Sequence, residues 1–178
     1  MNVIETSLQG CVIIEPTVYG DERGFFLETF QTKKYATVAG IHTPFVQDNH
    51  SRSTRGVLRG LHFQKTKPQG KLVRVVRGEV FDVAVDLRKG STTFGRWEGV
   101  ILSENNKRQF WVPPGFAHGF LVLSEIADFE YKCTDYYDPS DEGCVLWNDP
   151  DLNIDWPLDN PILSKKDSNA QVLSVLSI

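Results

Sequence analysis

The stretch that decides the fold is residues 56–87, GVLRGLHFQKTKPQGKLVRVVRGEVFDVAVDL. It contains three strand-like runs, VLRGLHF, KLVRVV and EVFDVAVDL, separated by a loop with Pro68 and Gly70 and then by Gly78. Apolar runs bounded by glycine and proline are typical of β-strands. Four basic side chains interrupt the apolar pattern: Arg59, His62, Lys71 and Arg74. A buried charge is costly unless it is paired or used, so this concentration marks a candidate site.

Short strand-like runs continue on both sides of this stretch. Strands are predicted at GCVIIEP (ended by Pro16), at 25–30 after a turn at Gly20–Asp21, and within FVQDNHS. A turn and a strand are expected in STTFGRWEGVILS, two strands in NKRQFWVPPGFAHGFLVL and another in IADFEYKCTDYYDP. One short helix is expected at QTKKYATVAG, closed by Gly40. Turn signals recur at intervals of about ten residues, which favours an all-β sandwich or barrel. From Asp138 onward we expect a loop-rich tail with short helical turns around PILSKKDSNA, all within one domain, 1–178.

The composition excludes several classes of protein. The net charge of −4 argues against nucleic-acid binding, although RSTRGVLR and KLVRVVR could hold a small anionic ligand. Cys11, Cys133 and Cys144 are widely spaced, which fits neither a disulfide framework nor a zinc site. We see no signal peptide and no apolar run of membrane-spanning length, so a cytoplasmic protein without a membrane partner is expected. The nucleotide-cradling GxGxxG and GxxxxGK[ST] motifs and the GxSxG elbow are missing.

His118 lies in VPPGFAHGF, where the spacing P-x-G-x-x-H precedes an apolar strand. This resembles the second motif of the cupin superfamily, which implies a jelly-roll barrel. The first cupin motif supplies metal ligands as H-x-H, but the corresponding place here reads His62-Phe63-Gln64. One ligand of the pair is therefore missing, and we do not expect a closed metal site.

Several side chains could carry chemistry on such a barrel. Imidazole accepts and releases protons near neutral pH, so His62 is a candidate base, although a lone core histidine is common. Arg59 would point to the opposite face from His62 unless Gly60 hosts a bulge. Lys71 is either an edge charge or a cation that stabilises an oxyanion.

Two further candidates lie towards the C-terminus. Alternation places Tyr131 on the same face as Phe129 and Cys133, so it is either core or a general acid facing a cavity. Tyr137 begins a loop suited to stacking on a ligand ring. Asp167 could fold back onto His62 and orient it.

Seven segments, taken together, resemble the dTDP-4-dehydrorhamnose 3,5-epimerase family: GDERGFF, FVQDNHS, GVLRGLHFQ, QGKLVRVVRGEVFDVAVDLR, PPGFAHGF, YKCTDYYDP and WNDPDLNIDWP. They occur in order over nearly the whole chain. The resemblance implies a cofactor-independent isomerase that converts dTDP-4-dehydro-6-deoxy-D-glucose to dTDP-4-dehydro-L-rhamnose. It also implies a homodimer, with N-terminal strands of about residues 1–50 at the interface.

The resemblance assigns roles to individual positions. His62 would remove the protons at C3 and C5, with Asp167 as its partner. Lys71, helped by His118, would stabilise the enolate, and Tyr131 would return a proton on the opposite sugar face. Arg23, Phe26 and Glu28 would reach the nucleotide from the partner subunit. Further substrate contacts would come from Gln47, Asn49, Arg59, Tyr137, Glu142 and Lys166.

Three other functions remain open at this point. A relative could epimerise one carbon only or isomerise a keto sugar, with the histidines kept. A metal-dependent cupin oxygenase would need the ligand missing beside His62. A non-catalytic cupin would only bind the sugar.

Overall fold

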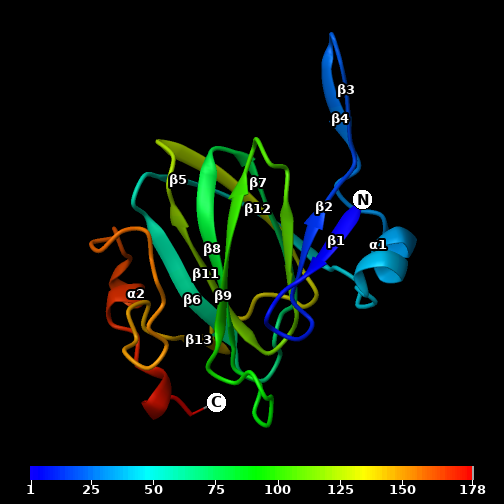
Figure 1. Cartoon of the computed structure of the whole chain (residues 1–178). Coiled ribbons are helices and arrows are strands. Elements are labelled where there is room, and N and C mark those ends of the chain that lie inside the picture. Colours follow the sequence, from blue (N-terminus) through cyan, green and yellow to red (C-terminus); the bar gives the residue numbers. More distant parts are fainter. Residues whose placement is uncertain (178) are drawn as a thin grey trace.

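The computed structural model describes residues 1–177 and consists mainly of two β-sheets packed face to face (Figure 1). One sheet has six strands in the order β1-β2-β10-β7-β12-β5, and the other has five in the order β13-β6-β11-β8-β9. The strands of the first sheet are β1 (Asn2–Glu5), β2 (Val12–Glu15), β10 (Gln109–Val112), β7 (Lys71–Arg77), β12 (Ile126–Cys133) and β5 (Gln47–Thr54). Those of the second are β13 (Glu142–Cys144), β6 (Leu58–Gln64), β11 (Phe116–Val122), β8 (Glu79–Asp86) and β9 (Trp97–Ser103). The prediction of an all-β jelly roll is confirmed.

The main core lies between the two sheets. Alternate residues of each strand point inward, so Val73, Phe110 and Phe129 of the six-stranded sheet meet Leu102 and Phe120 of the other. The rings of Phe120 and Phe129 stack with their centroids 4.1 Å apart. The polar side chains of His62, Lys71 and Tyr131, on β6, β7 and β12, line a cavity together with Phe120 and Phe129 of this core.

Segments at the two ends of the chain cover the outer faces. Helix α1 (Thr32–Ala39) places Tyr35 against Ile14 and Trp111, and Gly40 ends it in the left-handed conformation with φ 69°, as predicted. The C-terminal tail packs Leu152 and Trp156 on the five-stranded sheet. Two parallel bridges, Val57 to Ile162 and Val145 to Gln171, tie the tail to the barrel. As expected, the tail has little regular structure: the three-residue β13, the four-residue α2 (Lys165–Ser168) and the short 3-10 helix η1 (Leu173–Val175).

A hairpin of β3 (Val18–Asp21) and β4 (Gly24–Leu27) projects away from both sheets (Figure 1). The predicted turn at Gly20–Asp21 and the predicted strand to Phe30 are both wrong, since the chain reverses at Glu22–Arg23 and the strand ends at Leu27. The Asp21 carboxylate accepts a hydrogen bond from the backbone N–H of Arg23 at 2.9 Å. This local bond stabilises the turn at Glu22–Arg23, two residues after the predicted position. Strand β1 was not predicted.

Gly60 interrupts the pairing of β6 with β11, as the bulge hypothesis required. His118 pairs with His62, but Phe120 pairs with Arg59, so the register shifts between them. Gly60 has φ +134°, and a Cβ there would lie 2.6 Å from the Gly119 Cα, so only glycine fits. The shift brings Arg59 and His62, three residues apart, to the same cavity.

Among residues 1–177 no helix combines the length and the apolar character needed to cross a membrane. The three cysteines are free thiols, and Cys11 and Cys133 are buried.

Candidate active site

Two adjoining cavities open inside the barrel and share three lining residues: His62, Lys71 and Tyr131. The smaller, of about 340 Å³, is also lined by Gln47, Asn49, Gln64, Gln69, Tyr137 and Glu142. The larger, of about 610 Å³, is also lined by residues that include Arg59, His118, Phe129, Lys166 and Asp167. Together they have the size of a typical ligand pocket with a few convergent polar groups. Residues from β5, β6, β7, β11, β12, β13 and the C-terminal tail therefore meet at one place.

His62 and Asp167 form a hydrogen-bonded pair, with 2.6 Å between His62 Nε2 and Asp167 Oδ1. Asp167 lies in α2, where its backbone N–H donates to the capping hydroxyl of Ser164 at 3.1 Å. Burial raises the pKa of Asp167, but hydrogen bonds from His62, Ser164 and the Gly60 backbone outweigh burial and lower it below its usual range. An ionised carboxylate only accepts hydrogen bonds, so Nε2 carries the proton and donates it. Nδ1 is therefore the lone-pair nitrogen, and it lies 4.0 Å from Glu142 Oε1.

A second pair lies deeper, where His118 Nε2 is 2.9 Å and 3.0 Å from the two carboxylate oxygens of Asp82. Asp82 is fully buried on β8, the strand beside β11. Burial raises the pKa of Asp82, while His118 and Lys71 favour its charged form. His62 and His118 are direct partners across β6 and β11, so the two pairs are neighbours. His118 thus lines the larger cavity together with His62.

Lys71 opens β7 and places its Nζ 6.0 Å from the centre of the Tyr131 ring. Burial lowers the pKa of Lys71, although nearby Asp82 and Glu142 favour its charged form. Burial also raises the pKa of Tyr131, so its hydroxyl keeps its proton at neutral pH. The predicted inward alternation of Phe129, Tyr131 and Cys133 on β12 is confirmed by their places in or against the barrel core. The site thus combines a histidine–carboxylate pair, a protonated phenol and a buried lysine.

The predicted polar contacts of the tail also meet here. Glu142 Oε2 accepts hydrogen bonds from the Tyr137 hydroxyl at 3.0 Å and from Lys166 Nζ at 2.7 Å. Burial raises the pKa of Glu142, but these two bonds reverse that effect and lower it. Glu142 thereby joins the loop after β12 to the helix that carries Asp167.

The remaining predicted contacts lie along β5 and β6. The Gln47 amide donates to Asn49 Oδ1 at 3.1 Å, and both residues line the smaller cavity. Arg59 lines the larger cavity, where its Nε donates to the Ser53 hydroxyl at 3.0 Å.

Arg23, Phe26 and Glu28 lie apart from these cavities. Arg23 pairs with Asp21, and Glu28 pairs with Lys34 at 3.1 Å. Arg23 and Phe26 instead line a hollow of their own hairpin. Within one chain the structure does not bring these three residues to the two cavities.

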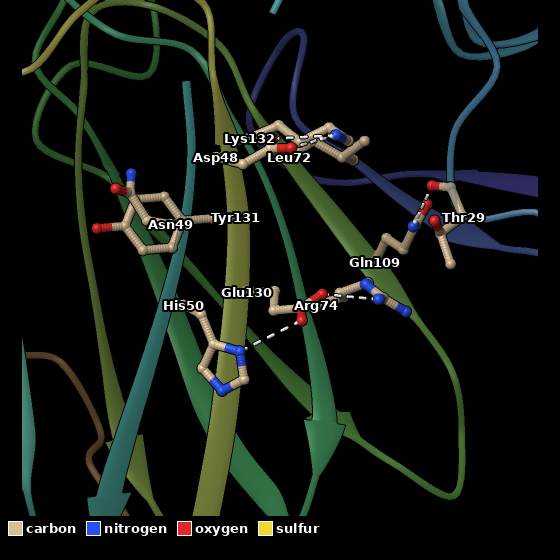
Figure 2. Close-up of a pocket in the computed structure, with 10 residues that line it drawn as sticks. All are labelled: Thr29, Asp48, Asn49, His50, Leu72, Arg74, Gln109, Glu130, Tyr131 and Lys132. Carbon is tan, nitrogen blue, oxygen red and sulfur yellow. Dashed lines mark hydrogen bonds and ion pairs between the residues drawn. The ribbon is translucent and has the colours of Figure 1, made fainter. Parts of the chain in front are cut away.

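Figure 2 shows that alternate residues of β5 and β12 point to opposite sides of the sheet. Asn49 and Tyr131 point one way, whereas Glu130 points the other, towards Arg74 and His50. Arg74 therefore faces outward and is paired with Glu130 at 2.7 Å. It is the one basic residue of the opening stretch that belongs to this outer hollow of about 260 Å³ and not to the site.

The residues not expected from the sequence include Gln64 and Gln69, which line the smaller cavity, and two ionisable groups, Asp82 and Cys144. Asp82 is a carboxylate in the middle of the apolar run EVFDVAVDL, so the burial argument applied to Arg59 and His62 would have found it. Cys144 pairs with His62 across β13 and β6, and its Sγ lies 3.8 Å from Asp167 Oδ1. Ligand atoms of His62, Cys144 and Asp167 lie within 4.8 Å of one another, so these three are the residues of the described chain best placed to hold a metal. No spacing rule in the sequence links them.

Comparisons with known proteins agree with this geometry. The model of the family described as dTDP-4-dehydrorhamnose 3,5-epimerase matches residues 5–174. The enzyme of that name from Shigella flexneri is 58% identical over 172 residues, which span 96% of this chain and 95% of that protein.

Solved structures give the same result. The dTDP-6-deoxy-D-glucose-3,5-epimerase of Legionella pneumophila, in complex with dTDP-4-keto-L-rhamnose, superposes with a TM-score of 0.96 at 60% identity, over 99% of this chain and 94% of that one. A 3'-monoepimerase of Streptomyces bikiniensis, in complex with dTDP-quinovose, has a TM-score of 0.89 at 38% identity, over 95% and 86% of the two chains. The chain belongs to the dTDP-4-dehydrorhamnose 3,5-epimerase family.

Proposed function

We propose that the protein epimerises C3 and C5 of dTDP-4-dehydro-6-deoxy-D-glucose, giving dTDP-4-dehydro-L-rhamnose. The observation that carries the proposal is the lining that the two cavities share: a histidine paired with a carboxylate, a tyrosine and a lysine. A sugar that enters either cavity contacts the same base and the same acid. Close relatives with this activity support the choice of substrate.

The chemistry follows from the position of the C4 ketone. C3 and C5 both flank it, so loss of a proton from either carbon gives an enolate with its charge on the C4 oxygen. Nδ1 of His62 takes the proton, because Nε2 is occupied by Asp167. The carboxylate stabilises the imidazolium that forms, as an orienting carboxylate does in other histidine–aspartate pairs.

Stabilisation of the enolate falls to Lys71. A preorganised cation in a site of low dielectric stabilises developing negative charge more strongly than water does. Its place between the two cavities lets it serve the same oxygen after the sugar has turned from one reacting carbon to the other. Tyr131 then returns a proton from the other face, and that change of face inverts the centre.

Solvent exchange tests the proposal. In heavy water, the substrate should gain deuterium at C3 and at C5, and the product should have the inverted configuration at both carbons by NMR. Label at C3 alone would make the protein a monoepimerase. Absence of label at both carbons would overturn epimerisation altogether.

Tyr131→Phe separates the base from the acid in the same assay. Without the phenol, His62 returns the proton to the face from which it came. We expect exchange to continue while inversion falls by about 10²-fold, the usual effect of removing a general acid. Equal loss of exchange and inversion would show that Tyr131 is not the acid.

A metal-dependent oxygenase is tested by assay of the protein after exhaustive treatment with a chelator. We expect full epimerase activity without added metal. Loss of activity that iron or manganese restores would reverse this view.

We further propose that the protein works as a homodimer in which the β3–β4 hairpin reaches the site of the partner. The hairpin stands away from its own barrel (Figure 1), and Tyr19, Phe25 and Phe26 on it are 60–68% exposed. Arg23 would bring a guanidinium to the diphosphate, which it can bind through two parallel hydrogen bonds. The free thiols fit a reducing compartment such as the cytoplasm.

Complementation tests the exchange of hairpins. Arg23→Ala and His62→Ala chains, each with low activity, are unfolded, mixed and refolded together. In a mixed dimer one site combines an intact hairpin with an intact His62, so activity should rise to about a quarter of wild type, the share given by random pairing of equal amounts. No recovery would mean that the hairpin serves its own chain or no site. Each variant refolded alone is the control.

A further inference from the structure

Three side chains that commonly ligate metals converge beside the catalytic base. His62 Nε2 lies 2.6 Å from Asp167 Oδ1, and Cys144 Sγ lies 3.8 Å from the same oxygen. All three ligand atoms lie within 4.8 Å of one another. They come from β6, β13 and α2, and the direct pairing of Cys144 with His62 holds two of them side by side.

The distances suit a tetrahedral ion after a small adjustment. Zinc lies about 2.0–2.2 Å from nitrogen and oxygen ligands and about 2.3 Å from sulfur, so ligand atoms around it are about 3.3–3.6 Å apart. The gap between Cys144 Sγ and Asp167 Oδ1 is already close to that. The His62–Asp167 contact has to open by less than about 1 Å, and the ligand atoms of His62 and Cys144, within 4.8 Å of each other, have to come to the same spacing. Three protein ligands leave the fourth position for water, as in open zinc sites.

We propose that His62, Cys144 and Asp167 form a binding site for one soft divalent cation of the Zn²⁺ class, and that its occupation switches the epimerase off. A thiolate with an imidazole selects Zn²⁺ and similar soft ions over Mg²⁺ and Ca²⁺, which prefer oxygen ligands. The bound ion would be neutralised by one thiolate and one carboxylate, which suits a half-buried place. Lys166 adds little repulsion because Glu142 already pairs with it at 2.7 Å.

The loss of activity follows from the two nitrogens of His62, and this step rests on the proposed function. In the free enzyme Nε2 carries the proton and Nδ1 accepts one from the sugar. An ion on Nε2 takes that lone pair, so the single ring proton moves to Nδ1. The thiol proton of Cys144 passes to solvent. The His62 ring then has no free lone pair. It cannot act as a base, although its position in the site is almost unchanged.

The test uses the full-length protein, freed of metal by a chelator. Cd²⁺ is added and the ultraviolet charge-transfer band of cadmium–thiolate bonds is followed. Zn²⁺ binding is measured by calorimetry, and initial rates are measured at the same concentrations. We expect one ion per chain, a rate that falls in proportion to occupancy, and full recovery when the chelator is restored.

Variants distinguish metal bound at the proposed site from metal bound by another cysteine. Cys144→Ser and Cys144→Ala should lose the cadmium band and weaken Zn²⁺ binding by about tenfold or more, since loss of even a supporting contact to a ligand costs that much. Each rate is compared with the same variant's metal-free rate. Cys11→Ala, which removes a buried thiol elsewhere, should bind and respond like wild type. Circular dichroism checks that every variant is folded.

The outcomes distinguish the two proposals. A cadmium band that persists without Cys144 would overturn the site. Stoichiometric binding without loss of rate would overturn the inhibition. A metal-free protein that binds Cd²⁺ through Cys144 but never epimerises the sugar would keep the site and defeat the proposed function.

Discussion

The two histidine–aspartate pairs of the barrel are similar in geometry and different in surroundings. In both, a carboxylate binds Nε2 of the histidine, and the two histidines face each other across β6 and β11. The His62 side chain is 25% exposed, whereas that of His118 is 7% exposed. The Asp167 partner comes from the C-terminal tail, and Asp82 comes from the adjoining strand. Both histidines line the larger cavity, so we infer that the greater exposure of His62 and the lowered pKa of its partner Asp167 favour His62 over His118 as the base.

The strongest test of this contrast removes each imidazole in turn. His62→Ala should reduce turnover by about 10³-fold or more, because the chemical step loses its base. Binding of dTDP should change little, since His62 is not among the nucleotide contacts. Turnover is measured by product formation and binding by calorimetry. A His62→Ala protein that keeps a tenth of its activity would give the role of base to another residue.

Replacing the carboxylates gives the next largest effect. Asp167→Asn should reduce turnover by about 10²–10³-fold, because an amide can donate to Nε2 and favour the wrong tautomer of His62. KM should change much less than kcat. Asp167→Glu, which keeps the carboxylate, should recover part of the loss. If Asp167→Asn and Asp167→Glu were equally impaired, Asp167 would have a structural role in the C-terminal tail and would not set the tautomer of His62.

Substitutions in the buried His118–Asp82 pair should reduce turnover less than those at His62 and Asp167. His118→Asn is expected to reduce turnover by about tenfold, the effect of one lost hydrogen-bonding group near the enolate. Asp82→Asn should give a similar or smaller loss, and the double variant should be no worse than the worse single variant, because the two residues act as a unit. Additive losses would mean that His118 and Asp82 act separately.

Stability should depend on pH with opposite signs at the two carboxylates. The pKa of Asp167 is lowered by hydrogen bonds that outweigh its burial, so the stabilisation it contributes is present above the unfolded-state pKa and is lost as the pH falls through the folded-state pKa. The pKa of Asp82 is raised by burial, so the fold binds its proton more tightly and stability falls as the pH rises between the two values.

Denaturant titrations of the two asparagine variants check these signs. At neutral pH Asp167→Asn should be destabilised by about 2 kcal/mol, the worth of hydrogen bonds to a charged group. That difference from wild type should shrink as the solution is acidified. Asp82→Asn should stay within about 1 kcal/mol of wild type at neutral pH, because the amide keeps an acceptor and avoids the burial that disfavours the charged carboxylate. A reversal of the two patterns would contradict the contrast in surroundings.

Local patterns were sufficient for the all-β class, for helix α1 with its Gly40 cap and for the inward face of β12, whereas the jelly roll was expected from the resemblance to cupins. Alternation and turn residues encode such features directly. These patterns gave the wrong position for the hairpin turn, because a side-chain hydrogen bond from the Arg23 backbone N–H to Asp21 determines where the chain reverses. The contact of Asp167 with His62 spans 105 residues, and the grouping of Cys144 with them depends on how β13 pairs with β6. Such contacts are set by the packing of the tail, which no local pattern describes.

Gly60 has a consequence for how this site can diversify. The glycine and its neighbour Gly119 lie so close that any added side chain would push β6 and β11 apart. One such change would misplace Arg59 and His62 together, with no intermediate in which only one of them moves. New substrate preferences should therefore arise at the rim, where Tyr137 and Glu142 stand on a loop and a short strand. The barrel therefore fixes the positions of Arg59 and His62, and evolution can change substrate preference more easily at the residues around Tyr137 and Glu142.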